Sequence, residues 1–241
     1  MDAFFDIVGY SIPNIGKEKN GDSYIFEYLE NEEILVAVVA DGVSKQPCDW
    51  FASETTCKKL LECFKLQEGD KNIHQRLLAS ISETNKFVIN IEGNCRKMAS
   101  TLSVIVWPTS GNNLYISNIG DSRIYSLKDE TLEQLTKDDS FITNEKVLMH
   151  GGLRLIDKST LTKVIGQDNI SIGIAEKSLE VGEIIILATD GFYDARKAVY
   201  NKIMIELSKS ESFKDGFTTV INKLEMLRGD DLTAIAMRRN R

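Results

Sequence analysis

The chain contains little proline, little histidine and no long apolar run. Its 241 residues include three prolines and two histidines, and no Gly/Ser-rich or low-complexity stretch divides them. No linker is visible and 42% of the residues are hydrophobic, so we expect a single domain over residues 1–241. The first residues lack the basic start and apolar centre of a signal peptide, and no run reaches the length of a membrane span. We therefore expect a cytoplasmic protein with no membrane partner.

The chain also has fewer positively charged than negatively charged side chains. Lys and Arg number 29 against 36 Asp and Glu, which gives a net charge of −7. Proteins that bind nucleic acid or anionic lipid surfaces carry clustered positive charge. The composition therefore predicts that neither nucleic acid nor an anionic membrane surface is the main partner.

Histidine and cysteine show no metal-binding pattern. His74 and His150 have no ligand-type spacing, so zinc is disfavoured. The four cysteines also lack metal-type spacing, and their pattern alone leaves disulfides open. Cys57 shares one face of a helical pattern with Leu60 and Phe64, so we expect it to pack in the core.

Carboxylates stand at the ends of four apolar strand patterns. The run 34–40 leads into Asp41-Gly42, and the run 183–189 leads into Asp190-Gly191. Asp121 follows the strand pattern at 114–116, and Asp230 precedes the alternating pattern at 233–237. A buried strand holds a side chain rigidly, and a glycine beside it lets backbone, ligand or metal come close. Several such carboxylates repel one another unless cations neutralise them, and oxygen ligands suit Mg or Mn.

The order of the motifs resembles the metal-dependent type 2C serine/threonine protein phosphatases, particularly their compact bacterial members. The resemblance runs nearly from end to end of the chain. The matching segments are Asn20-Gly21-Asp22-Ser23, Ala40-Asp41-Gly42-Val43, Ala99-Ser100-Thr101, Gly120-Asp121-Ser122-Arg123, Leu135-Thr136-Lys137-Asp138, Leu161-Thr162-Lys163-Val164-Ile165-Gly166, Thr189-Asp190-Gly191-Phe192-Tyr193-Asp194 and Asp230-Asp231-Leu232-Thr233.

The resemblance implies a function, a cofactor and partners. Such enzymes hydrolyse phosphoserine and phosphothreonine in proteins with a water activated by two Mn or Mg ions. Their partners are a phosphorylated protein substrate and a cognate Ser/Thr kinase.

The resemblance also implies site residues. Asp41 would bridge two ions, with the Gly42 carbonyl as a further ligand, and Asp190 and Asp230 would complete the first ion. These three aspartates are the candidate catalytic residues. Asp121 and Asp194, with Asp190 shared, match a third and weaker metal site.

Two departures from the family pattern bear on activity. The family usually has Glu directly before the position of Asp22, where this chain has Gly21. Either Asp22 takes over as a metal ligand or the second site is looser and filled by water. The family's phosphate-binding Arg is also missing, which leaves Lys17 and Lys19 as candidates that act as point charges. These departures favour an alternative function, a weakly active or inactive module that binds phosphorylated partners in a signalling assembly.

The coarse periodicity predicts an α+β fold. Helix pairs follow each block of strands, which suits a four-layer α-β-β-α sandwich of two central antiparallel sheets flanked by helix pairs. Between the blocks, residues about 138–172 show little periodicity, and the resemblance makes them a flap beside the active site. The predicted strands are 4–10, 23–29, 34–40, 101–107, 113–118, 123–127, 184–189 and 233–238, and the predicted helices are 49–66, 71–91, 195–208 and 214–227.

Overall fold

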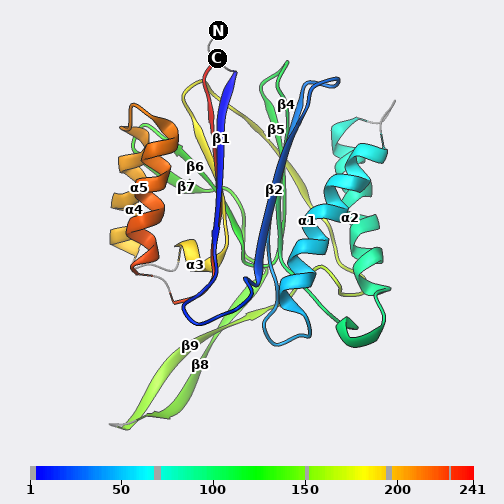
Figure 1. Cartoon of the computed structure of the whole chain (residues 1–241), viewed down its shortest axis with the longest axis vertical. Helices are drawn as coiled ribbons and strands as arrows, with labels where there is room; N and C mark the ends of the chain where they lie inside the picture. The colour runs from blue at the N-terminus through cyan, green and yellow to red at the C-terminus, as the bar shows by residue number, and fades with distance from the viewer. Residues whose placement is uncertain (1–3, 68–71, 150–151, 194–196, 228) are drawn as a thin grey trace.

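Two five-stranded antiparallel sheets form the centre of the molecule (Figure 1). The computed structural model describes residues 4–67, 72–149, 152–193, 197–227 and 229–241. In spatial order, the first sheet contains β1 (Phe5–Ile12), β12 (Leu232–Arg239), β11 (Ile184–Ala188), β6 (Arg123–Lys128) and β7 (Thr131–Gln134). The second sheet contains β10 (Ile174–Ser178), β5 (Asn113–Ile119), β4 (Leu102–Pro108), β3 (Ile34–Asp41) and β2 (Asp22–Leu29).

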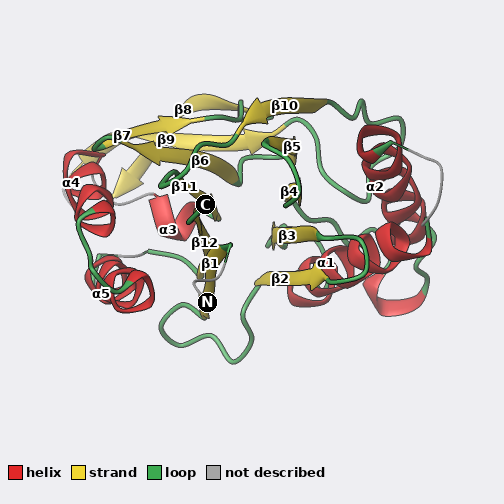
Figure 2. Ribbon diagram, turned by 90° about the horizontal axis from the view of Figure 1, so that it is seen from above, coloured by secondary structure: helices red, strands yellow, loops and turns green. Residues whose placement is uncertain are grey.

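Helices cover the outer faces of both sheets. Figure 2 shows one pair on each side of the stacked strands. The second sheet is covered by α1 (Asp49–Leu66) and α2 (Ile73–Ile89), and the first sheet by α4 (Lys197–Ser208) and α5 (Phe213–Glu225). Two short helices, η1 (Gly93–Cys95) and α3 (Asp190–Tyr193), lie in the connections. The expected four-layer α-β-β-α sandwich is therefore confirmed.

Three apolar layers hold the sandwich together, and β3 shows how the sequence specifies them. Its alternate residues Leu35, Ala37 and Val39 are fully buried between the two sheets, where they pack in one cluster with residues of β11 and β12. The residues between them face α1 and pack against Leu60 and Phe64. Successive strand residues point to opposite faces, so a strand buried on both faces is a continuous apolar run. Each large side chain contributes about 1.5–3 kcal/mol on burial.

A long hairpin projects from the end of the sandwich at the bottom of Figure 1. It pairs β8 (Ser140–Met149) with β9 (Gly152–Leu161), in a register that runs from Ser140 opposite Leu161 to Met149 opposite Gly152. The sequence predicts little regular structure here, because its residues show little apolar periodicity. Phe141 and Ile142, neighbours at its base, are both exposed, at 49% and 70%.

Other local features also differ from the sequence expectations. The short strands β7 and β10 are not predicted, because their mostly exposed or half-buried side chains leave no strong pattern. Cys48 and Cys95 form a disulfide, which their spacing of 47 residues does not indicate. Cys57 is buried in the core as expected. No helix in the described ranges is long and apolar enough to cross a membrane.

Candidate metal centre

The predicted carboxylates meet at one end of the sandwich because the strands that carry them end there. Asp22 opens β2 and Asp41 closes β3, and the antiparallel register places the two residues opposite each other. Asp190 begins α3 directly after β11, and Asp230 lies just before β12. Since β11 and β12 belong to one sheet and β2 and β3 to the other, both sheets contribute to the site.

A cavity of about 440 Å³ lies at this end of the sandwich. Its lining includes residues from the base of the β8–β9 hairpin, Ser159 to Leu161, and the loop Val43 to Gln46. The predicted site residues that line it are Lys17, Asp41, Gly42, Asp121, Asp190 and Asp230. One cavity thus brings together residues that are more than 200 positions apart.

The electrostatics of Asp22 and Asp41 fit a cation site. Burial raises the pKa of Asp22 to about 7, and the negative charges of Asp190 and Asp231 act in the same direction. The Thr189 hydroxyl opposes this by donating to Asp22 Oδ2 at 2.7 Å. Burial also raises the pKa of Asp41 well above its usual value, and its neighbour Asp22 adds to the shift. Carboxylates forced together in this way are stabilised by hard divalent ions, so the donor set fits Mg or Mn.

Within the described ranges, no three His, Cys, Asp or Glu side chains stand together at ion-binding distance. Asp41 and Asp190 are half-buried at the cavity wall.

Two close backbone contacts explain the Asp-Gly pairs. A Cβ atom on Gly42 would lie 2.1 Å from the carbonyl oxygen of Asp49, and one on Gly191 would lie 1.8 Å from that of Asp231. Both distances are far shorter than any van der Waals contact. Glycine is therefore required beside Asp41 and Asp190 so that the next segment can pack against the site.

Asp121 contacts the β8–β9 hairpin. Its Oδ2 is 3.4 Å from the hydroxyl of Ser159, and its backbone carbonyl accepts a hydrogen bond from Tyr193 Oη at 2.7 Å. Burial raises its pKa, and the nearby charge of Asp138 contributes. Asp121 thus connects the acidic cavity to this hairpin.

Arg123 in the Gly-Asp-Ser-Arg motif has a structural role. Its guanidinium binds the carboxylate of Asp138 through Nη2 at 2.7 Å and Nε at 3.0 Å, and it lies 3.8 Å from the centre of the Tyr193 ring. Burial works against its charge, but the hydrogen bonds that it donates to Asp138 raise its pKa. These contacts hold Arg123 at the cavity's edge, where it orders the residues beside Asp121.

Lys17 lies in the cavity and is held there by Asp231. Lys17 Nζ is 2.7 Å from Asp231 Oδ2 and 3.4 Å from Asp230 Oδ1. Burial disfavours the charge of Lys17, yet these carboxylates raise its pKa above its ordinary value. Asp231, 3% exposed, also accepts hydrogen bonds from the backbone N–H groups of Gly21 and Asn14, at 2.8 and 2.6 Å. Sequence reasoning missed this role, although Asp where the family pattern has Asn was a visible signal.

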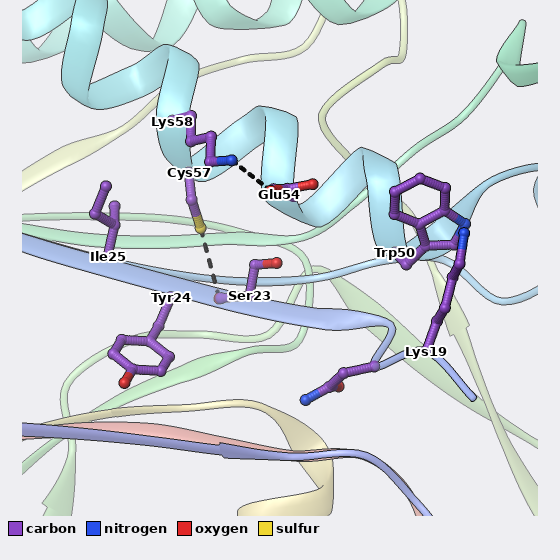
Figure 3. Close-up of a pocket in the computed structure, with 9 residues that line it drawn as sticks. Lys19, Ser23, Tyr24, Ile25, Trp50, Glu54, Cys57 and Lys58 are labelled. Carbon is purple, nitrogen blue, oxygen red and sulfur yellow. Dashed lines mark hydrogen bonds and ion pairs between the residues drawn. The ribbon is translucent and has the colours of Figure 1, made fainter. Parts of the chain in front are cut away.

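Three predicted residues are not seen in the cavity lining. Lys19 Nζ lies 3.5 Å from the centre of the Trp50 ring, in a separate pocket between β2 and α1 that Glu54 and Lys58 also line (Figure 3). Asp22 is 5% exposed and does not line the cavity. Asp194 lies outside the described residues.

The fold is a four-layer α-β-β-α sandwich with a cavity lined by aspartates at one end. The sequence pattern of the protein phosphatase 2C family matches residues 16–234, so the chain belongs to this family. Curated relatives include the serine/threonine phosphatase stp of Listeria welshimeri, 26% identical over 92% of this chain and 90% of that protein. Another is a putative protein phosphatase of Mycoplasma genitalium, 26% identical over 97% of this chain and 94% of that protein.

Solved structures show the same fold. The Mycobacterium tuberculosis serine/threonine phosphatase PstP/Ppp superposes with a TM-score of 0.76 at 20% identity, over 98% of this chain and 99% of that one. The catalytic domain of PstP in complex with two manganese ions gives a TM-score of 0.75 at 19% identity, with the same coverage. The chain therefore has the architecture of these phosphatases along its whole length.

Proposed function

We propose that this protein is a Mn- or Mg-dependent phosphatase that hydrolyses phosphoserine and phosphothreonine in proteins. The convergence of Asp41, Asp190 and Asp230 with Lys17 on one cavity is the observation that supports this most directly. Three carboxylates and one ammonium group suit a site that holds divalent ions and a phosphoryl group together. The names of the curated relatives support the same substrate class.

The residues of the cavity divide into metal ligands and phosphate contacts. In the proposal, Asp41 would hold both ions, with the Gly42 carbonyl as a further ligand, and Asp190 and Asp230 would complete the first ion. When bound, the ions stabilise charge on the phosphoryl oxygens and lower the pKa of the attacking water. Lys17 neutralises phosphoryl charge as a single ammonium group.

The remaining acidic residues support these ligands. Asp22 lies opposite Asp41 in the strand register, and its charge adds to burial in raising the pKa of Asp41, so in this proposal Asp22 orients the bridging carboxylate or joins it as a ligand. Asp121, with Asp190 and Asp194, forms the third and weaker ion site in this proposal. Loss of Asp121 would then change the response to high metal concentration more than the basal activity.

Residues about 138–172 form the flap in this proposal. The hairpin β8–β9 leaves the sandwich beside the cavity, and Ser159, Thr160 and Leu161 at its end line the cavity wall. A phosphorylated protein must pass this hairpin to reach the carboxylates. We therefore assign substrate choice to the flap, and we treat residues 1–241 as one catalytic domain that acts in the cytoplasm opposite a Ser/Thr kinase.

One assay tests the proposed function. Purified protein is given a phosphothreonine peptide with Mn, with Mg and with EDTA, and released phosphate is measured. Release that depends on metal is the expected result. Binding of the peptide without release would favour the alternative, a phosphatase-like module that recognises phosphorylated partners, to which the departures at Gly21 and Lys17 point.

Metal should also stabilise the folded chain. The buried, mutually repelling Asp22 and Asp41 disfavour the metal-free fold, and an ion at a hundred times its Kd stabilises the protein by about 2.7 kcal/mol. For a chain of this size the Tm is expected to rise by about 5–10 °C on adding Mn. Differential scanning fluorimetry measures the shift, with Asp41→Asn as the comparison. An equal rise in that variant would mean that Mn acts elsewhere.

A further inference from the structure

Position 21 contributes only backbone to the metal centre. Gly21 stands where the family usually has a glutamate that binds the second ion. Its carbonyl accepts a hydrogen bond from Gly42 N at 2.9 Å, so it lies directly beside the residue whose carbonyl is the proposed ligand of that ion. In this chain a carboxylate ligand for that ion would have to come from another residue.

Asp49 places a carboxylate next to the same position from a different element. A Cβ atom built on Gly21 would lie 3.3 Å from Asp49 Oδ2 and 3.0 Å from Asp231 Oδ2. Asp231 is already occupied by Lys17 and by backbone N–H groups. Asp49 Oδ1 accepts a hydrogen bond from Trp50 N at 2.8 Å, whereas Oδ2 has no partner among the described residues. Of the two carboxylates, Asp49 is the one with a free oxygen.

The start of α1 holds Asp49 firmly against the metal-binding loop. Asp49 is the first residue of this helix of 18 residues, and its carbonyl oxygen is the atom that forbids a side chain on Gly42. The preceding residue, Cys48, is joined to Cys95 by the disulfide. Backbone packing on one side and a covalent link on the other thus limit the movement of Asp49 relative to Gly42.

We propose that Asp49 replaces the missing glutamate and gives the second divalent ion its additional carboxylate ligand, beside Asp41 and the Gly42 carbonyl. The inference rests on the proposed function, because it concerns the same metal centre. A hard divalent cation binds a carboxylate oxygen at coordination distance, whichever helix, strand or loop carries that carboxylate. With Asp at position 49 in place of Glu at position 21, the site keeps the same charge. The carboxylate then comes from the start of α1 and not from the start of β2.

Calorimetric titration of the metal-free full chain with MnCl₂ tests this assignment without any activity measurement. Asp49→Asn keeps an oxygen for the Trp50 N–H group but removes the charge. We expect the wild type to bind two ions before the third and weakest site fills, and the variant to bind the weaker of these two with a Kd raised at least about tenfold. Asp215→Asn, which alters the acidic residue in the first turn of α5, is the matched control and should leave both Kd values unchanged.

A rescue variant shows whether positions 21 and 49 are equivalent. Gly21 does not have a positive φ, so its backbone accepts a side chain. In the double variant Gly21→Glu with Asp49→Ala, the weaker ion should bind within about threefold of the wild-type Kd, since one carboxylate again serves it. Gly21→Glu alone should not tighten binding, because the new side chain begins 3.0–3.3 Å from two existing carboxylates.

The outcomes separate the inference from the proposed function. Wild-type binding of both ions by Asp49→Asn would overturn the inference and leave the proposed function intact. Failure of the double variant to recover the ion lost in Asp49→Asn would overturn the equivalence of the two positions, and with it the inference. Failure of the wild type itself to bind Mn would overturn the proposed function.

Discussion

Replacement of Asp190 or Asp230 by asparagine should reduce Mn-dependent phosphate release at least about a thousandfold, which corresponds to ~4 kcal/mol of lost transition-state stabilisation. Both side chains line the cavity with Asp41, and a neutral amide holds a divalent ion far less firmly than a carboxylate. The fold should persist, because the change removes repulsion between negative groups. Initial rates with a phosphothreonine peptide at saturating Mn measure the effect.

Asp129→Asn is the control for this experiment. Asp129 lies in the exposed turn between β6 and β7 with a φ of 47°, a conformation that asparagine also adopts readily. Its replacement should leave the rate unchanged. Near-normal turnover in both Asp190→Asn and Asp230→Asn would contradict the metal-ligand assignment.

Removal of the Lys17 ammonium group should weaken substrate binding more than the chemical step. Lys17 Nζ lies in the cavity beside Asp230 and Asp231, where it can neutralise a phosphoryl oxygen. We expect Lys17→Ala to raise KM for a phosphopeptide about tenfold with a smaller decrease in kcat, since a lost ground-state contact acts mainly on KM. Lys17→Arg should retain or improve the wild-type KM, because a guanidinium can bind two oxygens.

The neighbouring Lys19 is the matched control. It lies in the same loop but contacts the Trp50 ring in a different pocket, so Lys19→Ala should keep the wild-type KM. Steady-state kinetics of Lys17→Ala, Lys17→Arg and Lys19→Ala measure these KM values. Identical KM values for wild type and Lys17→Ala would mean that phosphate is bound by the metal ions and the backbone alone.

The sequence by itself determined the layers of the fold and the main acidic residues proposed as metal ligands. β3 is apolar at every position because its two faces belong to two different cores, and that pattern is visible without coordinates. Asp41 and Asp190 each stand between such a strand and a glycine, so local sequence defines both the carboxylate and the close backbone approach beside it. The order of these motifs also indicated the family, which the pattern match over residues 16–234 confirms.

Only the tertiary structure decided which polar residues serve the site. Lys17 and Lys19 look equivalent in the sequence, but a contact with Asp231, 214 positions away, brings Lys17 into the cavity, while Trp50 holds Lys19 outside it. In the sequence, Asp49 is an ordinary acidic residue in the first turn of a helix. It lies beside Gly21 only because β2 and α1 pack together. Local sequence patterns report which way a side chain faces along its own strand or helix. They do not report which distant segment lies opposite, and that depends on how the two sheets and their helices pack.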